Sequence, residues 1–133
     1  MNISGATLIV VADASEARFY CERVRMGPLT ERDGDHMVAT DQEHLSGTRH
    51  RGDRRWPQRE PERRFLKRVA KQIVRHALSS EFDRLVLVGL PRTIGVLRES
   101  LPAEVLSRID ATDGHSRRGE GVAALRRHLS EAR

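Results

Sequence analysis

Residues 62–89 read ERRFLKRVAKQIVRHALSSEFDRLVLVG and hold the two patterns that decide the fold. In the first part, apolar residues recur at helical spacing on one broad stripe: Phe65, Leu66, Val69, Ala70, Ile73, Val74, Ala77 and Leu78. This spacing predicts a helix over 62–78, and Pro61 with Glu62 suits its first turn. The second part, residues 85–88, is wholly apolar, which is typical of a strand buried on both faces of a sheet.

The chain opens with a second strand of the same kind. Residues 6–12 (ATLIVVA) are a continuous apolar run rich in β-branched residues, which predicts another central strand. Residues 18–25 are expected to form the next strand, and residues 29–32 a short edge strand. The inward side chains of the strand at 18–25 would be Phe19, Cys21 and Val24. Since the three strands are close in sequence, a meander is the economical pairing. Between the first two, Asp13 and Glu16 resemble a capping pair for a short helical turn.

Helices and a strand alternate in the second half of the chain. Thr93 is expected to cap a helix, Pro102 opens another helical turn, and a short strand is expected around Ile109. A C-terminal helix is predicted from the spacing of Val122, Leu125 and Leu129. Buried strands that alternate with helices indicate a parallel half of the sheet. We therefore expect a single α/β domain over residues 1–133, with a mixed sheet of about five strands and helices on its faces.

Residues 41–61 differ from the rest of the chain because they contain only two apolar side chains. Glycine, proline and charged residues follow one another there without a period, so we expect a long, basic and mobile loop. The chain carries 24 Lys and Arg against 19 Asp and Glu, a net charge of +5, and all of the 24 except Lys67 and Lys71 are arginine. The excess is concentrated in residues 49–68, with nine basic and three acidic side chains. Such a cluster favours an acidic partner.

A nucleic-acid surface is the main functional prediction from this cluster. Arginine suits phosphate because its guanidinium donates hydrogen bonds in a planar fork, and Trp56, the only tryptophan, can stack on a base. The predicted contacts are Arg49, Arg51, Arg54, Arg55, Trp56 and Arg59 from the loop and Arg64, Lys67, Arg68 and Lys71 from the helix. The alternative is that Trp56 folds back over the edge of the core and the arginines are solvated.

Two smaller sites are also predicted. Arg92 and Thr93 stand where a buried strand gives way to a helix, and free backbone N–H groups and a guanidinium can bind an anion there. The alternative is an exposed, capped helix start. Asp13 and Arg18 follow the first strand and form a candidate strand-end site, against a purely capping role for Asp13.

The sequence contains no pattern typical of a membrane protein, a metal-binding protein or a known class of enzyme. The longest apolar run, residues 6–12, is far shorter than the roughly 20 residues of a spanning helix, so no membrane partner is expected. Asp41, His44 and His50 match no strong zinc spacing, and no complete catalytic motif occurs, so we predict no catalytic residue, metal or cofactor. A lone Cys21 permits no internal disulfide and fits a reducing cytoplasm, which is the expected location.

Five blocks of the sequence carry a resemblance to a known family. In order they are residues 12–14 (ADA) with Ala17-Arg18, the Gly/Arg/His-rich loop, Glu62-x-x-Phe65, residues 82–88 (FDRLVLV) and Pro91-Arg92-x-x-Gly95-x-Leu97-Arg98. Together they resemble the bacterial host attachment protein family, whose members resemble the middle domain of eukaryotic and archaeal peptide-chain release factors and of Pelota. The resemblance implies a ribonuclease-H-like α/β fold in an intracellular bacterial protein, with the ribosome, rRNA or tRNA as expected partners.

The sequence departs from release factors at the residues that carry their chemistry. Such factors hydrolyse peptidyl-tRNA with a Gly-Gly-Gln at the tip of the loop before the long helix. The matching loop here contains Gln42, Gly47, Gly52 and Gln58 but no Gly-Gly-Gln, so release activity does not follow from the resemblance. Residues 7–11 likewise contain no carboxylate for the two-metal site of a ribonuclease H.

Three functions remain open at this point. The first is a non-catalytic RNA- or ribosome-associated module that binds through the basic loop and helix face. The second is a regulatory adaptor with a protein partner, whose attachment phenotype is indirect. The third is a hydrolase acting on an ester or a tRNA-linked substrate. The basic cluster favours the first.

Overall fold

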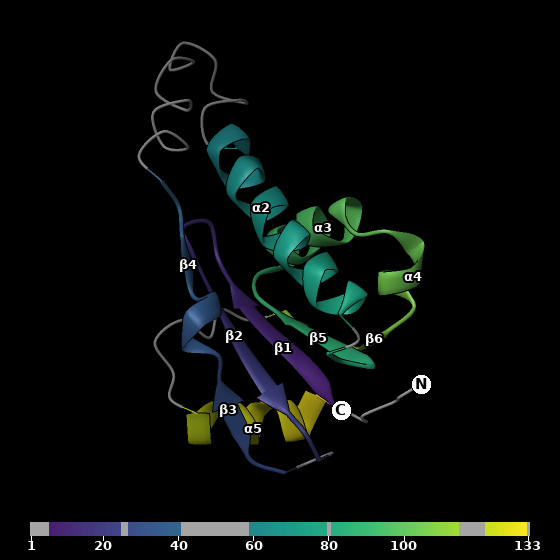
Figure 1. Ribbon diagram of the computed structural model, residues 1–133. Coiled ribbons are helices and arrows are strands. Elements are labelled where there is room, and N and C mark those ends of the chain that lie inside the picture. Colours follow the sequence, from purple (N-terminus) through teal and green to yellow (C-terminus); the bar gives the residue numbers. More distant parts are fainter. Residues whose placement is uncertain (1–5, 25–26, 41–58, 80, 115–121, 133) are drawn as a thin grey trace.

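The computed structural model describes residues 6–24, 27–40, 59–79, 81–114 and 122–132. These residues form a six-stranded sheet between two layers of helices, as Figure 1 shows. The strand order is β3-β2-β1-β5-β6, and a further short strand, β4, also pairs with β2. The predicted α/β class, with a mixed sheet and helices on its faces, is confirmed.

The parallel half of the sheet consists of β1 (Thr7–Ala12), β5 (Arg84–Val88) and β6 (Ile109–Asp113). Every residue of β1 is buried, and so are the last four of β5. Helices cover both faces of these strands, and strands buried in this way carry apolar residues on both sides. Burial on both faces therefore explains the continuous apolar runs at residues 6–12 and 85–88.

The antiparallel half is built around β2 (Glu16–Glu22), which pairs with β1 from Ala17 to Glu22. Its other edge is shared by β3 (Leu29–Glu31) and β4 (Met37–Val38). Between these two short strands the chain leaves the sheet as a 3-10 turn, η1 (Asp33–Asp35). The meander of the first three strands is confirmed, and β4 is an addition that the sequence did not predict.

Three helices lie over one face of the sheet: α2 (Arg59–Leu78), α3 (Pro91–Ser100) and α4 (Ala103–Leu106). The apolar stripe of α2 enters the larger core, where Phe65, Leu66, Val69 and Ile73 are fully buried. They pack with the side chains of β1, β2 and β5 that point to this face, among them Leu8, Val10, Phe19, Leu85 and Leu87.

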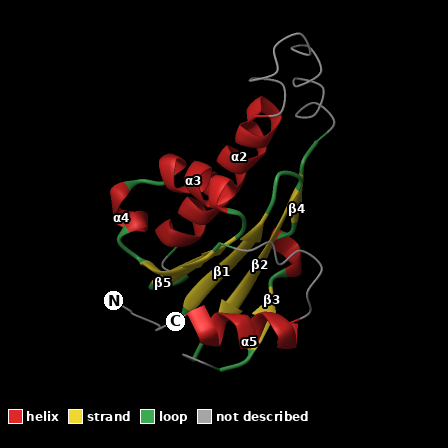
Figure 2. Ribbon diagram, turned by 180° about the vertical axis from the view of Figure 1, so that it is seen from behind, coloured by secondary structure: helices red, strands yellow, loops and turns green. Residues whose placement is uncertain are grey.

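The opposite face is covered by α5 (Val122–Ala132), the one helix of the described residues on that side of the sheet (Figure 2). Leu125 and Leu129 pack there on Ile9, Val11, Tyr20, Val86 and Val88. Polar contacts of Arg126 accompany this packing. Its guanidinium pairs with the fully buried Glu22 carboxylate of β2 and donates a 2.7 Å hydrogen bond to the Gly27 carbonyl oxygen. Arg126 therefore joins α5 to the β2–β3 connection.

The prediction of a helical turn after the first strand is wrong. Asp13 closes a tight turn between two paired strands instead: its Oδ1 accepts hydrogen bonds from the backbone N–H groups of Ser15 and Glu16, both at 2.8 Å. Ala12 and Ala17 pair directly across this turn. An aspartate that satisfies nearby N–H groups serves a turn as well as a helix start, and pairing of β1 with β2 selects the turn.

Other boundaries also differ from the predictions. The second strand spans Glu16–Glu22 and not 18–25, so Val24 lies beyond it and is 69 % exposed, whereas Phe19 is buried as predicted and Cys21 is half-buried. Thr93 does not cap α3, which begins at Pro91 without a side-chain cap. Thr93 is buried in the first turn of that helix. Of the loop predicted at 41–61, residues 41–58 lie outside the described part, and α2 begins at Arg59.

Candidate functional site at the carboxyl edge of the sheet

The carboxyl ends of β1, β5 and β6 meet at one edge of the sheet, and the first turn of α3 starts there. Ligand sites of α/β proteins gather at such an edge. The backbones come close: the Gly89 N–H donates to the Asp113 carbonyl at 3.0 Å, and a Cβ on Gly89 would lie 2.6 Å from the Ala12 carbonyl oxygen. Glycine is therefore required between β5 and α3.

The exposed face of α2 runs away from this edge and carries a row of basic side chains. Arg64, Lys67, Lys71 and Arg75 are exposed, while Phe65, Leu66 and Val69 of the opposite stripe are buried. Residues three or four apart lie on one side of a helix, so the four cations form a single stripe. We call these four residues the α2 basic stripe.

Arg68 is predicted to belong to the same surface, but its guanidinium also has a structural contact. It donates a 2.8 Å hydrogen bond to the Val38 carbonyl oxygen of β4 and lies 5.3 Å from the centre of the Phe65 ring. Arg68 is half-buried and links α2 to the edge strand. A role for it in nucleic-acid binding stays a prediction.

A shallow groove lies beside the basic stripe, between α2 and α3. It measures about 300 Å³ and is lined by Lys67, Lys71, Glu99 and Ser100. Glu99, one of the lining residues, also forms an ion pair with Arg63 of α2, with 2.9 Å between its Oε1 and the arginine Nη1. Two lysines thus face a hollow large enough for a phosphate group.

The remaining predicted nucleic-acid contacts lie outside the described residues. Arg49, Arg51, Arg54, Arg55 and Trp56 belong to the segment 41–58. Arg59 is the first residue of α2, and its side chain is not described. The α2 stripe and Arg68 are therefore the described part of the predicted surface.

The predicted anion site is partly occupied by the protein's own groups. Arg92 is 63 % exposed, and its Nε lies 3.3 Å from Oε1 of the buried Glu62 in α2. Thr93 points into the core and not toward solvent, being 2 % exposed. The sequence predicts Glu62 as a residue of the first helical turn and as part of a family motif, but not that its side chain is buried. Its burial follows from the packing of α2 against α3.

In the candidate strand-end site, the contacts given for Asp13 and Arg18 join each of them to other residues and not to one another. The Asp13 carboxylate is used by the turn, and Arg18 pairs with Glu31 at 2.6 Å and Glu16 at 3.2 Å. The hydrogen bond to Glu31 raises the pKa of the Arg18 guanidinium. Arg18 therefore crosslinks neighbouring strands β2 and β3.

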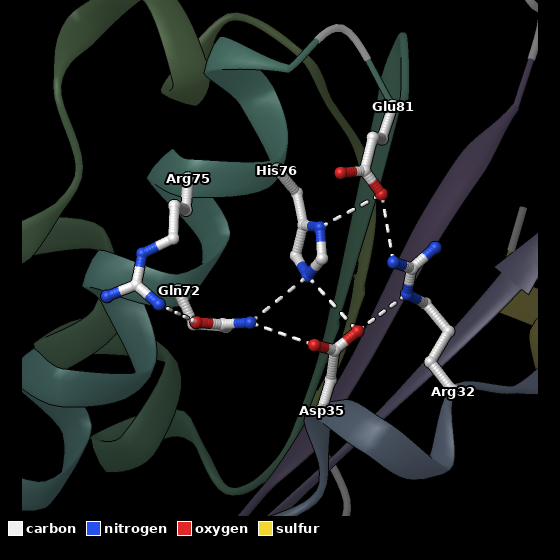
Figure 3. A network of polar contacts seen from close by, with 6 residues as sticks. All are labelled: Arg32, Asp35, Gln72, Arg75, His76 and Glu81. Carbon is white, nitrogen blue, oxygen red and sulfur yellow. Dashed lines mark hydrogen bonds and ion pairs between the residues drawn. The ribbon is translucent and has the colours of Figure 1, made fainter.

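A polar network between η1 and α2, shown in Figure 3, has no counterpart in the sequence predictions. His76 is buried, and its two ring nitrogens face carboxylates: Nδ1 lies 3.1 Å from Glu81 and Nε2 lies 3.2 Å from Asp35. Arg32 bridges the same two carboxylates, at 2.6 Å to Asp35 and 2.9 Å to Glu81. Gln72 donates to Asp35 at 2.8 Å.

The charges of the network act on its central carboxylate. Burial raises the pKa of Asp35, but the hydrogen bond from Arg32, the nearby His76 and the Gln72 amide outweigh it, so that the pKa lies below its usual value. The hydrogen bond with Asp35 raises the pKa of Arg32 in turn. In the sequence, this network is indicated only by the spacing of Gln72 and His76, which places them on one helix face. That spacing does not predict which residues they contact.

Neither a metal cluster nor a membrane span is found among the described residues. No three side chains of the His, Cys, Asp and Glu types lie close enough there to hold a metal ion. No described helix has both the length and the hydropathy to cross a membrane.

Comparison with known proteins gives one family. The model of bacterial archaeo-eukaryotic release factor family 12 matches residues 6–115, which include the whole sheet and helices α2 to α4. No curated protein matches the chain. The family description supports the release-factor side of the resemblance and points to a role connected with translation. An indirect attachment phenotype stays a prediction. The chain thus belongs to bacterial archaeo-eukaryotic release factor family 12.

Proposed function

We propose that the protein is a non-catalytic module that binds ribosomal or transfer RNA through the α2 basic stripe. The observation that carries the proposal is the stripe itself: Arg64, Lys67, Lys71 and Arg75 are exposed on one helix face, opposite the residues that build the core. A row of cations on a rigid helix can follow the phosphates of a strand.

Two further facts support this function. The arginine-rich sequence 49–59 directly precedes the stripe in the chain, so both belong to one basic stretch. The family is described by its relation to release factors, which act at the ribosome. No Gly-Gly-Gln is present in the chain, so the proposal contains no hydrolytic step.

Co-sedimentation of the purified protein with ribosomes, at low and at raised salt, tests the proposal. The wild-type protein should sediment with ribosomes at low salt and be released as salt rises, because phosphate contacts release counterions. The double variant Lys67→Ser/Lys71→Ser should be released at lower salt. Its matched control is Arg23→Ser/Arg127→Ser, which also removes two exposed cations but away from α2.

The outcomes separate the proposal from the adaptor function. Equal release of both double variants would contradict a site on α2. Binding that survives nuclease treatment and raised salt would instead indicate a protein partner. No association at low salt would contradict the ribosomal role.

A further inference from the structure

A small cavity lies between the first turn of α2 and the first turns of α3. It has a volume of about 180 Å³ and is lined by Glu62, Arg63, Arg92 and Val96. Pockets for drug-sized ligands measure roughly 300–1,000 Å³, so this cavity suits a smaller group. At roughly 30 Å³ for each liquid water molecule it corresponds to about six waters, which is the scale of one sugar ring.

Glu62 gives this cavity a buried carboxylate that can accept further hydrogen bonds. Its side chain is 7 % exposed, and within the described part of the chain its one hydrogen-bond partner is the Nε of Arg92 at 3.3 Å. Hydrogen bonds between such charged groups usually measure about 2.7–2.9 Å, and a carboxylate offers about four acceptor positions. A carboxylate buried with so few donors favours a ligand that brings more.

Two guanidinium groups lie at the rim of the cavity. Arg92 is 63 % exposed and uses its Nε toward Glu62, while Arg63 is 41 % exposed and uses Nη1 toward Glu99. Each guanidinium has five N–H donors, so both retain donors for an anion. Val96 supplies the apolar wall.

The charges select the class of ligand. A ligand with an ammonium group near Glu62 would be repelled by the positive charges of Arg63 and Arg92. A neutral hydroxyl group can donate a hydrogen bond to the Glu62 carboxylate without this repulsion. The rim favours an anion, and a planar guanidinium suits phosphate. We propose that the cavity binds a ribose 5-phosphate group, with its vicinal hydroxyls donating to Glu62 and its phosphate accepting from Arg92 and Arg63.

Two sources carry this group: a free 5′-mononucleotide and the 3′ end of an RNA strand. The inference goes beyond the proposed function because it does not need the α2 basic stripe. The Lys67→Ser/Lys71→Ser variant should bind the sugar phosphate as the wild type does. Either proposal can therefore fail while the other stands.

Calorimetric titration of the full chain with ribose 5-phosphate and with 2-deoxyribose 5-phosphate tests the inference. Loss of a hydrogen bond to a charged group should weaken binding of the deoxy sugar by about tenfold. Glu62→Gln should abolish this preference, and Arg92→Gln should weaken both phosphates by about tenfold. Matched controls are Glu104→Gln and Arg98→Gln, whose exposed side chains do not line the cavity.

The result that would overturn the inference is equal affinity for both sugars, or no binding of either. Thermal melts show whether each variant is folded, and NMR shifts of the wild-type backbone around Glu62 and Arg92 provide a readout without any substitution. Adenosine 5′-monophosphate and a short RNA, with a 3′-hydroxyl or a 3′-phosphate, then compete for the site. Competition by the nucleotide alone identifies the free nucleotide, and competition only by the RNA with a 3′-hydroxyl identifies the strand end.

Discussion

The two halves of the sheet are held by different kinds of contact. In the parallel half, β1 and β5 have apolar side chains on both faces, and helices bury nearly all of them. In the antiparallel half, the edge is divided into β3 and β4, and polar side chains secure it: Arg18 to Glu31, Arg32 and His76 to Asp35, and Arg68 to Val38.

This difference indicates which half of the sheet tolerates changes in its side chains. Close packing of the parallel half leaves no room for a change in volume, because a buried apolar core tolerates neither cavities nor added atoms. The edge with η1 is held by individual polar contacts, each of which contributes less. Along the chain, β4 of this polar edge is the last described element before α2.

The largest effect is expected in the packed half. Phe65→Ala should lower the free energy of unfolding by about 3–5 kcal/mol, because a fully buried aromatic ring leaves a cavity. Val24→Ala, at an exposed position of the antiparallel half, should change it by less than about 0.5 kcal/mol. Urea denaturation followed by circular dichroism measures both, and similar losses for the two would remove the distinction.

A second comparison uses two glycines. Gly89→Ala should cost about 1–3 kcal/mol, because the new Cβ would meet the backbone oxygen of Ala12 at 2.6 Å. Gly34→Ala in η1, with no atom within 4 Å of the new Cβ, should be neutral within about 0.5 kcal/mol. Thermal melts of the pair suffice. A neutral Gly89→Ala would mean that the carboxyl edge is less tightly closed than its backbone contacts indicate.

The polar network gives a smaller effect with a pH signature. Asp35→Asn should cost about 1 kcal/mol at neutral pH, since Arg32 and His76 keep their bonds to Glu81 and solvent screens the half-exposed Arg32. The folded-state pKa of Asp35 is lowered, so its contribution is present above the unfolded pKa of about 3.9 and is lost as pH falls through the folded value.

Unfolding free energies between pH 6 and pH 2 check this sign. The wild type should lose more stability than Asp35→Asn below about pH 4, because only the wild type has this carboxylate to protonate. Parallel curves for the two proteins would show that Asp35 contributes nothing to acid sensitivity.

The packed half was predictable because its signals are local. The apolar run at 6–12 and the helical stripe on 62–78 each determine their own element, and both were found where the sequence placed them. The antiparallel half was predicted less well. A strand of two residues, β4, has no periodicity to detect, and the Asp13 pattern fits a helix start and a turn equally.

The residues of the candidate site also differ in how well local sequence patterns predict them. Exposure of Lys67 and Lys71 follows from the helical pattern, so the α2 basic stripe could be predicted. The pair of Glu62 and Arg92 joins residues 30 positions apart, and Gln72 and Asp35 are 37 apart. Contacts of this kind depend on how the helices pack, and one sequence does not encode them in any local pattern.

The most direct test of the central claim is the salt dependence of RNA binding. Fluorescence anisotropy of a labelled single-stranded RNA, over a series of salt concentrations, gives the slope of log K against log salt. Each lost phosphate contact should reduce the slope by about 0.7, so Lys67→Ser/Lys71→Ser should reduce it by about 1.4, while Arg23→Ser/Arg127→Ser leaves it unchanged. Equal slopes for the wild type and the α2 variant would contradict the account.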